Sequence, residues 1–366
     1  MDPIISLIIP TRERCETLRY AIKSALAQES GALEIIVSDN ASRDGTPGVV
    51  SEFKDPRLRS IRTDRRLSMC DHYEFAVERA SGKFVLIIGD DDAVMPGAIR
   101  RLQECLETAA DIYTWDTPVY SWPTRDSKAI LNSFPKLSRD RWAAPAAKRS
   151  VRMGCCGYAR SPSVYHSAVS RETLLELKKK TGRIFHSTQP DVFLSFALPA
   201  LTERVFKIGR PLTMHGISEK SNGYDFRNER GEKNNIEKFL DEYGGYRLHP
   251  ALYPGIPMRA NMIPDAALAA MDLFPEYYRG VKFNYEAMWA HMLILWKFDA
   301  VLGVLGKAGD IRRRHEFNPA KFAFYYILLS AGYRLRKAFR RAHARKVIGA
   351  RCPDNILDCA KMLAAR

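Results

Sequence analysis

Short apolar runs alternate with helical patterns through the first hundred residues. The runs of strand length are 4–9, 35–37, 58–61 and 84–88. Between the first two runs, apolar residues from Leu18 to Leu26 recur at the spacing of one helix face, and residues 73–80 predict a further helix. Strands separated by helices of this length indicate βαβ units. The pattern therefore predicts an α/β fold with a Rossmann-like, mostly parallel sheet flanked by helices.

The apolar run 84–88 leads through Gly89 into three consecutive carboxylates, Asp90, Asp91 and Asp92. Such a run is typical of a strand that is buried on both faces. Three like charges at a strand end repel one another unless a positive charge lies among them, and a hard divalent cation with oxygen ligands would supply that charge. The alternative interpretation is a solvated acidic turn that caps a helix starting near Pro96.

Polar residues also follow two other predicted strands. Pro10-Thr11-Arg12 follows the first strand and Asp39 follows the second. Because the carboxyl ends of parallel strands meet at one sheet edge, where ligands bind, this favours a binding site over a bare turn. The chain has no Gly-x-Gly-x-x-Gly after its first strand and no Gly-x-x-x-x-Gly-Lys, which disfavours a dinucleotide fold or a P-loop.

The second part of the chain is less regular. Proline and tryptophan interrupt residues 112–150, which predicts extended segments and loops. The pattern then predicts a strand, two helices and a strand ending near His215, over 163–170, 171–180, 189–198 and 205–217. The polar, Gly- and Asn-rich residues 218–235 predict a mobile loop, and the pattern is helical from residue 236.

A net charge of +15 indicates an anionic partner. Much of the excess positive charge lies in residues 312–314 and 334–346. Charge alone does not make the chain a nucleic-acid binder, and no nucleic-acid partner is expected. Within 334–346, Leu335, Ala338 and Phe339 share a helix face that Arg and Lys surround. This segment is either an interfacial helix on an anionic membrane surface or a docked helix with a solvated basic face.

Composition and termini bear on the cellular compartment. The hydrophobic content of 46% and the charged content of 27% are those of an ordinary globular protein. The 7 cysteines are scattered and lack metal-finger spacing, which suits a reducing compartment. No signal peptide is visible, and the apolar run 322–333 is too short to span a bilayer. These features predict a cytoplasmic protein, peripheral on the inner membrane face if 334–346 binds lipid.

Three motifs resemble family 2 glycosyltransferases with the GT-A fold. They are Ile-Ser-Leu-Ile-Ile-Pro-Thr-Arg-Glu-Arg from Ile5, Glu-Ile-Ile-Val-Ser-Asp-Asn-Ala-Ser-Arg-Asp-Gly-Thr from Glu34, and Ala-Ser-Gly-Lys-Phe-Val-Leu-Ile-Ile-Gly-Asp-Asp-Asp from Ala80. The resemblance extends more weakly to about residue 217. It implies a GT-A domain over 1–235, divided into a nucleotide-sugar half (1–115) and an acceptor half (116–235), with a C-terminal helical extension over 236–366.

The resemblance implies a nucleoside-diphosphate sugar as donor, with uracil as its base. Pro10, Thr11 and Glu13 would line the base and ribose pocket. Asp39 would accept a hydrogen bond from the base, since a carboxylate offers only acceptors. The alternative role for Asp39 is an Asx-turn with Asn40.

The triplet corresponds to the metal motif of this family, with Gly89 where an Asp is common. On this alignment Asp90 faces the ribose or a metal-bound water, and Asp91 binds Mg²⁺ or Mn²⁺. Asp92 belongs to the same metal group and supports the site or caps the next helix. His215 would complete the metal shell or contact the diphosphate, and a His without such a role is the alternative.

Asp191 lies about a hundred residues after the metal motif, where inverting members of the family carry the general base. Its alternative role is to cap the helix after Pro190.

These residues predict an inverting, metal-dependent glycosyltransferase that acts on a glycan or lipid-linked acceptor. A sugar-phosphate nucleotidyltransferase is the first alternative, although Pro10-Thr11-Arg12-Glu13 stands where that class has a Gly-rich loop. A non-catalytic basic protein on anionic lipid or nucleic acid is the second, and the carboxylate cluster argues against it. Self-association through the helical tail, into a homo-oligomer, is an open alternative to membrane contact.

Overall fold

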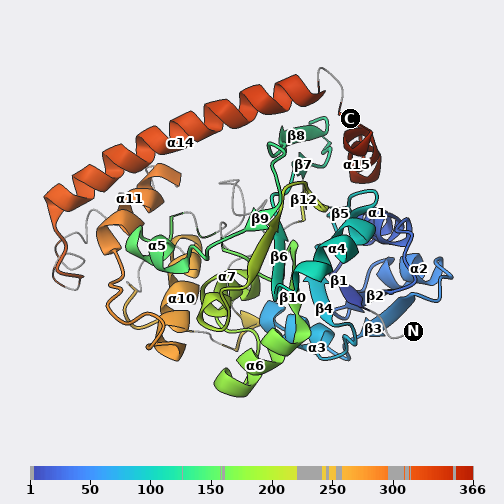
Figure 1. The fold of residues 1–366 in the computed structure, drawn as a ribbon, viewed down its shortest axis with the longest axis horizontal. Coiled ribbons are helices and arrows are strands. Elements are labelled where there is room, and N and C mark those ends of the chain that lie inside the picture. Colours follow the sequence, from blue (N-terminus) through green and yellow to red (C-terminus); the bar gives the residue numbers. More distant parts are fainter. Residues whose placement is uncertain are drawn as a thin grey trace.

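A mixed sheet of eight strands forms the centre of the computed structural model (Figure 1). The structure describes residues 4–365 except 126, 157, 159–160, 221–240, 245–246, 253–257, 296–308, 310–312, 314 and 349–351. The strands, in order across the sheet, are β3 (Leu58–Arg62), β2 (Leu33–Asp39), β1 (Ile5–Thr11), β4 (Phe84–Ile87), β10 (Ser167–Ser170), β6 (Ile112–Trp115), β11 (Val205–Ile208) and β9 (Arg141–Trp142). The first four are parallel, whereas β10 is antiparallel to both of its neighbours. The predicted α/β fold with a mostly parallel sheet is confirmed.

Helices cover both faces of this sheet because its strands carry apolar side chains on both sides. On β1, Leu7 and Ile9 join one core cluster, and Ile8 joins the other. The first face carries α1 (Cys15–Leu26), α2 (Thr46–Ser51) and α4 (Ala98–Cys105) with η1 (Leu106–Thr108). The second carries α3 (Met69–Val77), α5 (Ala147–Arg152), α6 (Arg171–Thr181) and α7 (Pro190–Ala197) with η3 (Leu198–Ala200).

A smaller sheet of four strands accompanies the large one. Its order is β5 (Ala93–Val94), β12 (Thr213–Ile217), β7 (Val119–Ser121) and β8 (Ile130–Ser133). The single strand predicted over 205–217 is therefore wrong, because β11 and β12 belong to different sheets. The break between these two strands begins at Gly209, where a Cβ would lie 1.9 Å from the Ser138 carbonyl oxygen. Pro211 follows and has no N–H that could join the hydrogen bonds of a sheet.

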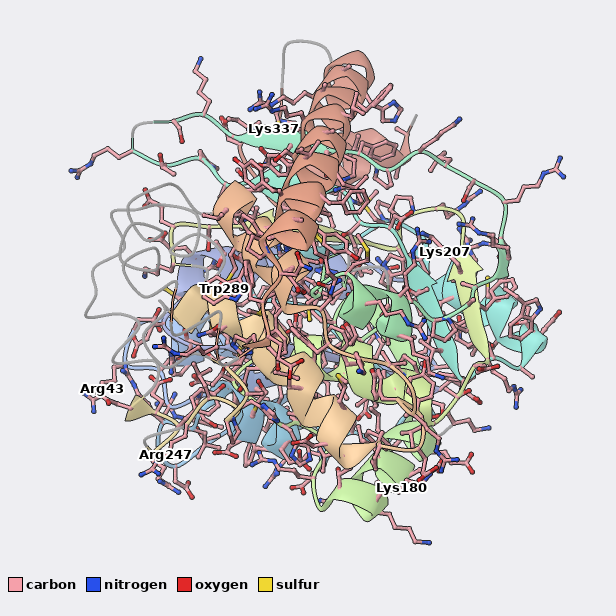
Figure 2. All side chains as sticks on the ribbon, turned by 90° about the vertical axis from the view of Figure 1, so that its left-hand side faces the viewer. Arg43, Lys180, Lys207, Arg247, Trp289 and Lys337 are labelled. Carbon is pink, nitrogen blue, oxygen red and sulfur yellow. The ribbon has the colours of Figure 1, made fainter. Side chains whose placement is uncertain are left out.

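The C-terminal region is helical, as predicted. Its helices are α10 (Met258–Leu273), which packs on α7, α11 (Tyr285–Leu295), α14 (Pro319–Ile348) and α15 (Ile356–Ala364). The long α14 packs on α11 and β8, and Figure 2 shows Trp289 of α11 between α14 and the body of the molecule. α15 returns to α1 and joins the core of the first sheet face. Within the described part of the chain, no helix is long and apolar enough to cross a membrane.

Candidate active site

The carboxyl ends of β1, β2 and β4 meet at one edge of the large sheet. Thr11 and Asp39 are register partners at the ends of β1 and β2. The hydroxyl of Thr11 donates a hydrogen bond of 2.7 Å to Oδ2 of Asp90, which follows β4. The predicted convergence of these residues on one edge is thus confirmed.

Asp90 is buried and paired with Arg14, the residue before α1. Its Oδ1 lies 2.9 Å from Nη1 of Arg14. Burial raises the pKa of Asp90, Arg14 lowers it, and Asp91 raises it again, with a net increase above the ordinary value. The guanidinium therefore supplies positive charge to the triplet from the protein itself, and sequence patterns gave no sign of it.

The main chain of Asp91 packs directly against β12. A Cβ at Gly216 would lie 1.7 Å from the Asp91 carbonyl oxygen, so only glycine permits this approach. The Asp91 carboxylate accepts through Oδ2 from the N–H (3.1 Å) and the hydroxyl (2.7 Å) of Ser218. Within the described residues its Oδ1 has no hydrogen bond, which leaves this oxygen available to a ligand.

Protein groups adjoin both oxygens of Asp92, as they do those of Asp90 and unlike those of Asp91. Oδ2 accepts from the Gly89 N–H (2.5 Å) and the Tyr165 hydroxyl (2.5 Å), and Oδ1 accepts from the Gly216 N–H (2.7 Å). Burial raises the pKa of Asp92, but the charges and hydrogen bonds of His166 and His215 more than offset it, so the pKa lies well below the usual value. Asp92 thus fixes the turn as a carboxylate. The expectation that it caps the next helix is wrong, because β5 and Gly97 precede α4.

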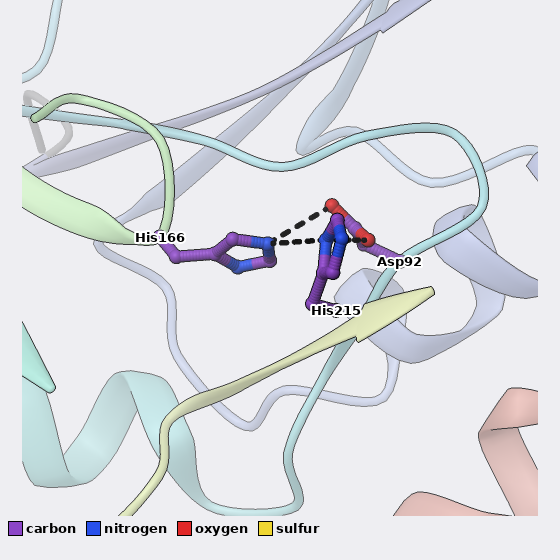
Figure 3. A group of neighbouring side chains, drawn as sticks. All are labelled: Asp92, His166 and His215. Carbon is purple, nitrogen blue, oxygen red and sulfur yellow. Dashed lines mark hydrogen bonds and ion pairs between the residues drawn. The ribbon is translucent and has the colours of Figure 1, made fainter. Parts of the chain in front are cut away.

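Two imidazoles face Asp92 (Figure 3). Nε2 of His166 lies 3.2 Å from Oδ2, and Nδ1 of His215 lies 3.4 Å from Oδ1. The three residues offer ligand atoms that all lie within 4.8 Å of one another. His166 also bonds Thr213 through Nδ1 (2.8 Å), the kind of support that orients metal-binding imidazoles, and it adopts a left-handed backbone (φ 55).

The donor set fits a divalent cation. Carboxylate oxygen and imidazole nitrogen together suit ions such as Mn²⁺, and carboxylate alone suits Mg²⁺. Asp91 offers an uncommitted oxygen, and the His215 side chain is one-third exposed. Asp92 offers less, because its oxygens already accept three hydrogen bonds.

Gly89 stands where the resembling family commonly has Asp, and the structure gives a physical reason. A Cβ at this position would lie 3.0 Å from both Oδ2 of Asp92 and the Tyr165 hydroxyl. Tyr165 and Asp92 therefore occupy the space that a larger side chain would need. Tyr165 comes from the segment before β10.

The predicted nucleotide side of the edge is held by side-chain bonds. Asp39 accepts from the Ser42 N–H (3.0 Å) through Oδ1 and pairs with Arg62 through Oδ2. A turn-forming role of Asp39 is therefore present in the structure, and contact with a base stays a prediction. Sequence patterns did not single out Arg62.

Pro10 and Thr11 close β1, and Glu13 follows them in a left-handed conformation (φ 57). The Glu13 carboxylate accepts from the Arg43 N–H (3.1 Å) and pairs with Arg66 (2.5 Å). Beneath this loop, Nε2 of His72 bonds the Ser38 hydroxyl (2.8 Å), and burial lowers the pKa of His72 to about 4.

Asp191 lies in the first turn of α7, as predicted, behind Pro190. Burial raises the pKa of its carboxyl, while the backbone amides of Val192 and Asp191 and then the imidazoles of His215 and His166 oppose the increase. The carboxylate is thus within electrostatic range of the His pair. Both predicted roles, base and helix N-terminal carboxylate, are compatible with this position.

Sequence patterns missed five side chains of this edge. They are Arg14, Arg62, Tyr165, His166 and Ser218. Tyr165 and His166 reach this edge because β10 lies antiparallel beside β4. Hydrophobic periodicity does not predict that pairing. Most of the predicted loop 218–235 lies outside the described residues, and Lys220 within the described part donates to the Glu13 carbonyl (3.1 Å).

Comparison with known proteins identifies relatives of the N-terminal part. Residues 6–165 match the family model described as "Glycosyl transferase family 2". Succinoglycan biosynthesis protein ExoO of Rhizobium meliloti is 32% identical over 141 residues, which are 37% of this chain and 40% of that protein. Abequosyltransferase RfbV of Salmonella typhimurium is 35% identical over 118 residues, 31% of this chain and 35% of that protein.

A lipid-linked acceptor occurs in the name of a further relative, GalNAc(5)-diNAcBac-PP-undecaprenol beta-1,3-glucosyltransferase of Campylobacter jejuni. It is 35% identical over 105 residues, 28% of this chain and 34% of that protein. Among solved structures, S. aureus TarS 1–349 in complex with UDP matches 92% of both chains with a TM-score of 0.48 and 14% identity. The chain spans less than half the length of each of the three sequence relatives.

Proposed function

Because residues 6–165 belong to glycosyl transferase family 2, we propose that the chain is an inverting, metal-dependent glycosyltransferase. It transfers a sugar from a nucleoside-diphosphate sugar, UDP-linked, to a hydroxyl of a glycan or of a lipid-linked acceptor. The observation that carries this proposal is the arrangement at the end of β4. There, Asp90 and Asp91 stand beside Thr11 of β1 and next to the His166–His215 pair.

The sugar donor binds along the edge formed by β1, β2 and β4. Pro10, Thr11 and Glu13 line the base and ribose pocket, with Asp39 at the base and Asp90 at the ribose. Asp91 and His215 would hold the Mg²⁺ or Mn²⁺ ion, and Asp92 orients His215. When bound, the ion would supply positive charge to the diphosphate leaving group. Arg14, fixed by Asp90, adds a positive charge to the same place.

Asp191 serves as the general base. It takes the proton of the acceptor hydroxyl while the oxygen bonds to the anomeric carbon from the face opposite the diphosphate. The bond from that carbon to the diphosphate breaks, and the diphosphate leaves with the electron pair, so the configuration inverts. The raised pKa of Asp191 suits this role, because a stronger base accepts the proton more readily.

The names of the relatives support the acceptor class. One acts on an undecaprenol diphosphate saccharide, and another takes part in succinoglycan synthesis. We extend this to an acceptor at the inner face of the membrane, a cytoplasmic site of action, and contact of residues 334–346 with an anionic membrane surface. Self-association into a homo-oligomer is a further proposal.

Replacement of Asp91 tests the function most directly. Asp91→Ala should reduce metal-dependent hydrolysis of the sugar donor, or its transfer, by at least about a hundredfold, because the carboxylate proposed to bind the metal is lost. Asp116→Ala is the matched control, since Asp116 is exposed and pairs only with Lys207 among the described residues. An Asp91→Ala protein with the wild-type rate would refute the proposal, provided that both variants show the wild-type unfolding temperature.

A further inference from the structure

Helix α14 presents an apolar stripe on the side that faces away from the molecule. The stripe consists of Phe324, Ile327, Leu328, Leu335 and Phe339, whose exposed fractions run from 47% to 73%. They lie three, four, eleven and fifteen residues after Phe324, a spacing that keeps them on one helix face. We call these five residues the outer stripe.

The inner side of α14 is docked on the protein. Leu329 is buried, and Phe322 packs against the cluster that contains Met288 and Trp289 of α11. In Figure 1, α11 and β8 lie on this inner side, and no element of the described residues covers the outer side. The helix is therefore held in place by one face while a second apolar face has no protein partner in the described part of the chain.

All charged residues of α14 are cationic. Apart from Lys321 they lie between residues 334 and 346, and the helix contains no Asp or Glu. Lys321 pairs with the buried Glu286 (2.9 Å), whereas Arg334 and Arg341 are exposed beside the outer stripe. An apolar stripe bordered by cations that form no ion pair among the described residues complements a surface that is apolar in its interior and anionic at its rim.

An anionic bilayer has this combination. An interfacial helix buries its apolar face at the boundary of headgroups and acyl chains, and its basic side chains contact lipid phosphates. A second copy of the chain fits less well, because α14 carries no carboxylate that could pair with the cations of a facing α14. We propose that the outer stripe of α14 docks the protein onto the surface of an anionic bilayer.

The position of α14 relative to the candidate active site links this docking to the proposed reaction. α14 packs on β8, β8 pairs with β7, and β7 pairs with β12, which carries His215. A docked α14 therefore holds the edge of the active site at a fixed place near the bilayer. This consequence rests on the proposed transfer to a lipid-linked acceptor, and the docking itself extends the membrane contact proposed for residues 334–346 to the outer stripe.

Vesicle sedimentation of the full chain tests the proposal. The protein should sediment with vesicles of phosphatidylethanolamine and phosphatidylglycerol, should remain free with phosphatidylcholine alone, and should be released by added salt. Combined substitution of Ile327→Ser, Leu335→Ser and Phe339→Ser should lower the bound fraction about tenfold or more. Leu175→Ser, at an exposed leucine of α6, is the matched control and should bind as the wild type does.

Three results would overturn the docking. The first is that the wild type does not bind anionic vesicles at low salt, and the second is that the stripe variant binds them like the wild type. The third is that the stripe mediates self-association without vesicle binding. Equilibrium sedimentation would detect this self-association. Sugar-donor hydrolysis without vesicles is measured on the same proteins. Absence of donor hydrolysis by the wild type would contradict the proposed function but not the docking. Hydrolysis by the stripe variant at the wild-type rate would show that this variant is folded.

Discussion

At the scale of single residues, the three carboxylates after β4 have three different surroundings. Asp90 faces Arg14, Asp91 keeps one oxygen without a hydrogen bond among the described residues, and Asp92 is surrounded by donors. Burial raises the pKa of Asp90, yet Asp92 has a lowered pKa because His166 and His215 adjoin it. Adjacent residues of one type thus acquire separate roles from the groups packed around them.

The role of Asp191 as base gives a prediction at this scale. Asp191→Asn should lower kcat by about 10² to 10⁴ while leaving binding of the sugar donor unchanged, because the amide cannot accept the acceptor proton. The pKa of Asp191 is raised, so the wild-type rate should fall on acidification at a higher pH than an ordinary aspartate would give. The Asn variant should lack this acid limb, which steady-state rates across pH would show.

Asp191→Glu provides the control for geometry, since it keeps a carboxylate and should restore part of the rate. A helix-capping role alone would lower the unfolding temperature of Asp191→Asn without changing the pH profile. That outcome would remove Asp191 from the chemistry.

At the scale of elements, Glu34 shows how the strands are held at the edge opposite the active site. Its carboxylate, at the start of β2, accepts from the N–H of Ser81 (2.6 Å) and of Gly82 (3.1 Å) and from the Ser6 hydroxyl of β1. It thereby ties β1, β2 and the turn before β4 together. Burial raises the pKa of Glu34, but these bonds lower it more, and the pKa lies below its ordinary value.

Glu34→Gln should reduce the free energy of unfolding by about 1–2 kcal/mol at neutral pH, because all of these bonds are made to Oε1 and a neutral amide oxygen accepts them less strongly than a charged carboxylate oxygen. A lowered folded-state pKa contributes stability above the unfolded-state pKa of about 4.3 and loses it as the pH falls through the folded-state value. The difference between wild type and variant should therefore shrink in acid. Denaturant unfolding at several pH values measures it.

The exposed Glu52, paired with Arg19, is the control for Glu34. Glu52→Gln should leave the free energy of unfolding unchanged within error, and neither variant should alter transfer activity. A Glu34→Gln difference that grows on acidification would contradict the argument.

At the scale of the whole molecule, α15 closes the chain onto its beginning. Ile356 and Cys359 are buried in the core cluster of α1 and β1, and α15 also contacts β12. The predicted α/β fold with C-terminal helices is confirmed. The last of these helices packs against α1 and β5, so the C-terminal end of the chain contributes to the core of the first hundred residues.

Ile356→Ala should lower the free energy of unfolding by about 2–5 kcal/mol, because it leaves a cavity in a packed core. Leu175→Ala on the exposed face of α6 should change it by no more than about 0.5 kcal/mol. Denaturant titration of the full chain compares them. A loss below about 1 kcal/mol for Ile356→Ala would mean that α15 contributes little to the core.

The parallel strands β1 to β4 could be predicted from the chain, because their apolar runs and intervening helical patterns depend on local spacing alone. The same spacing predicted Thr11, Asp39 and the triplet at one edge, since parallel strands share that edge. The charges that face the triplet depend on long-range packing and could not be predicted. Arg14, Tyr165, His166 and Ser218 reach it through chain reversals, an antiparallel insertion and the Gly216 approach, and none of these leaves a periodic signal.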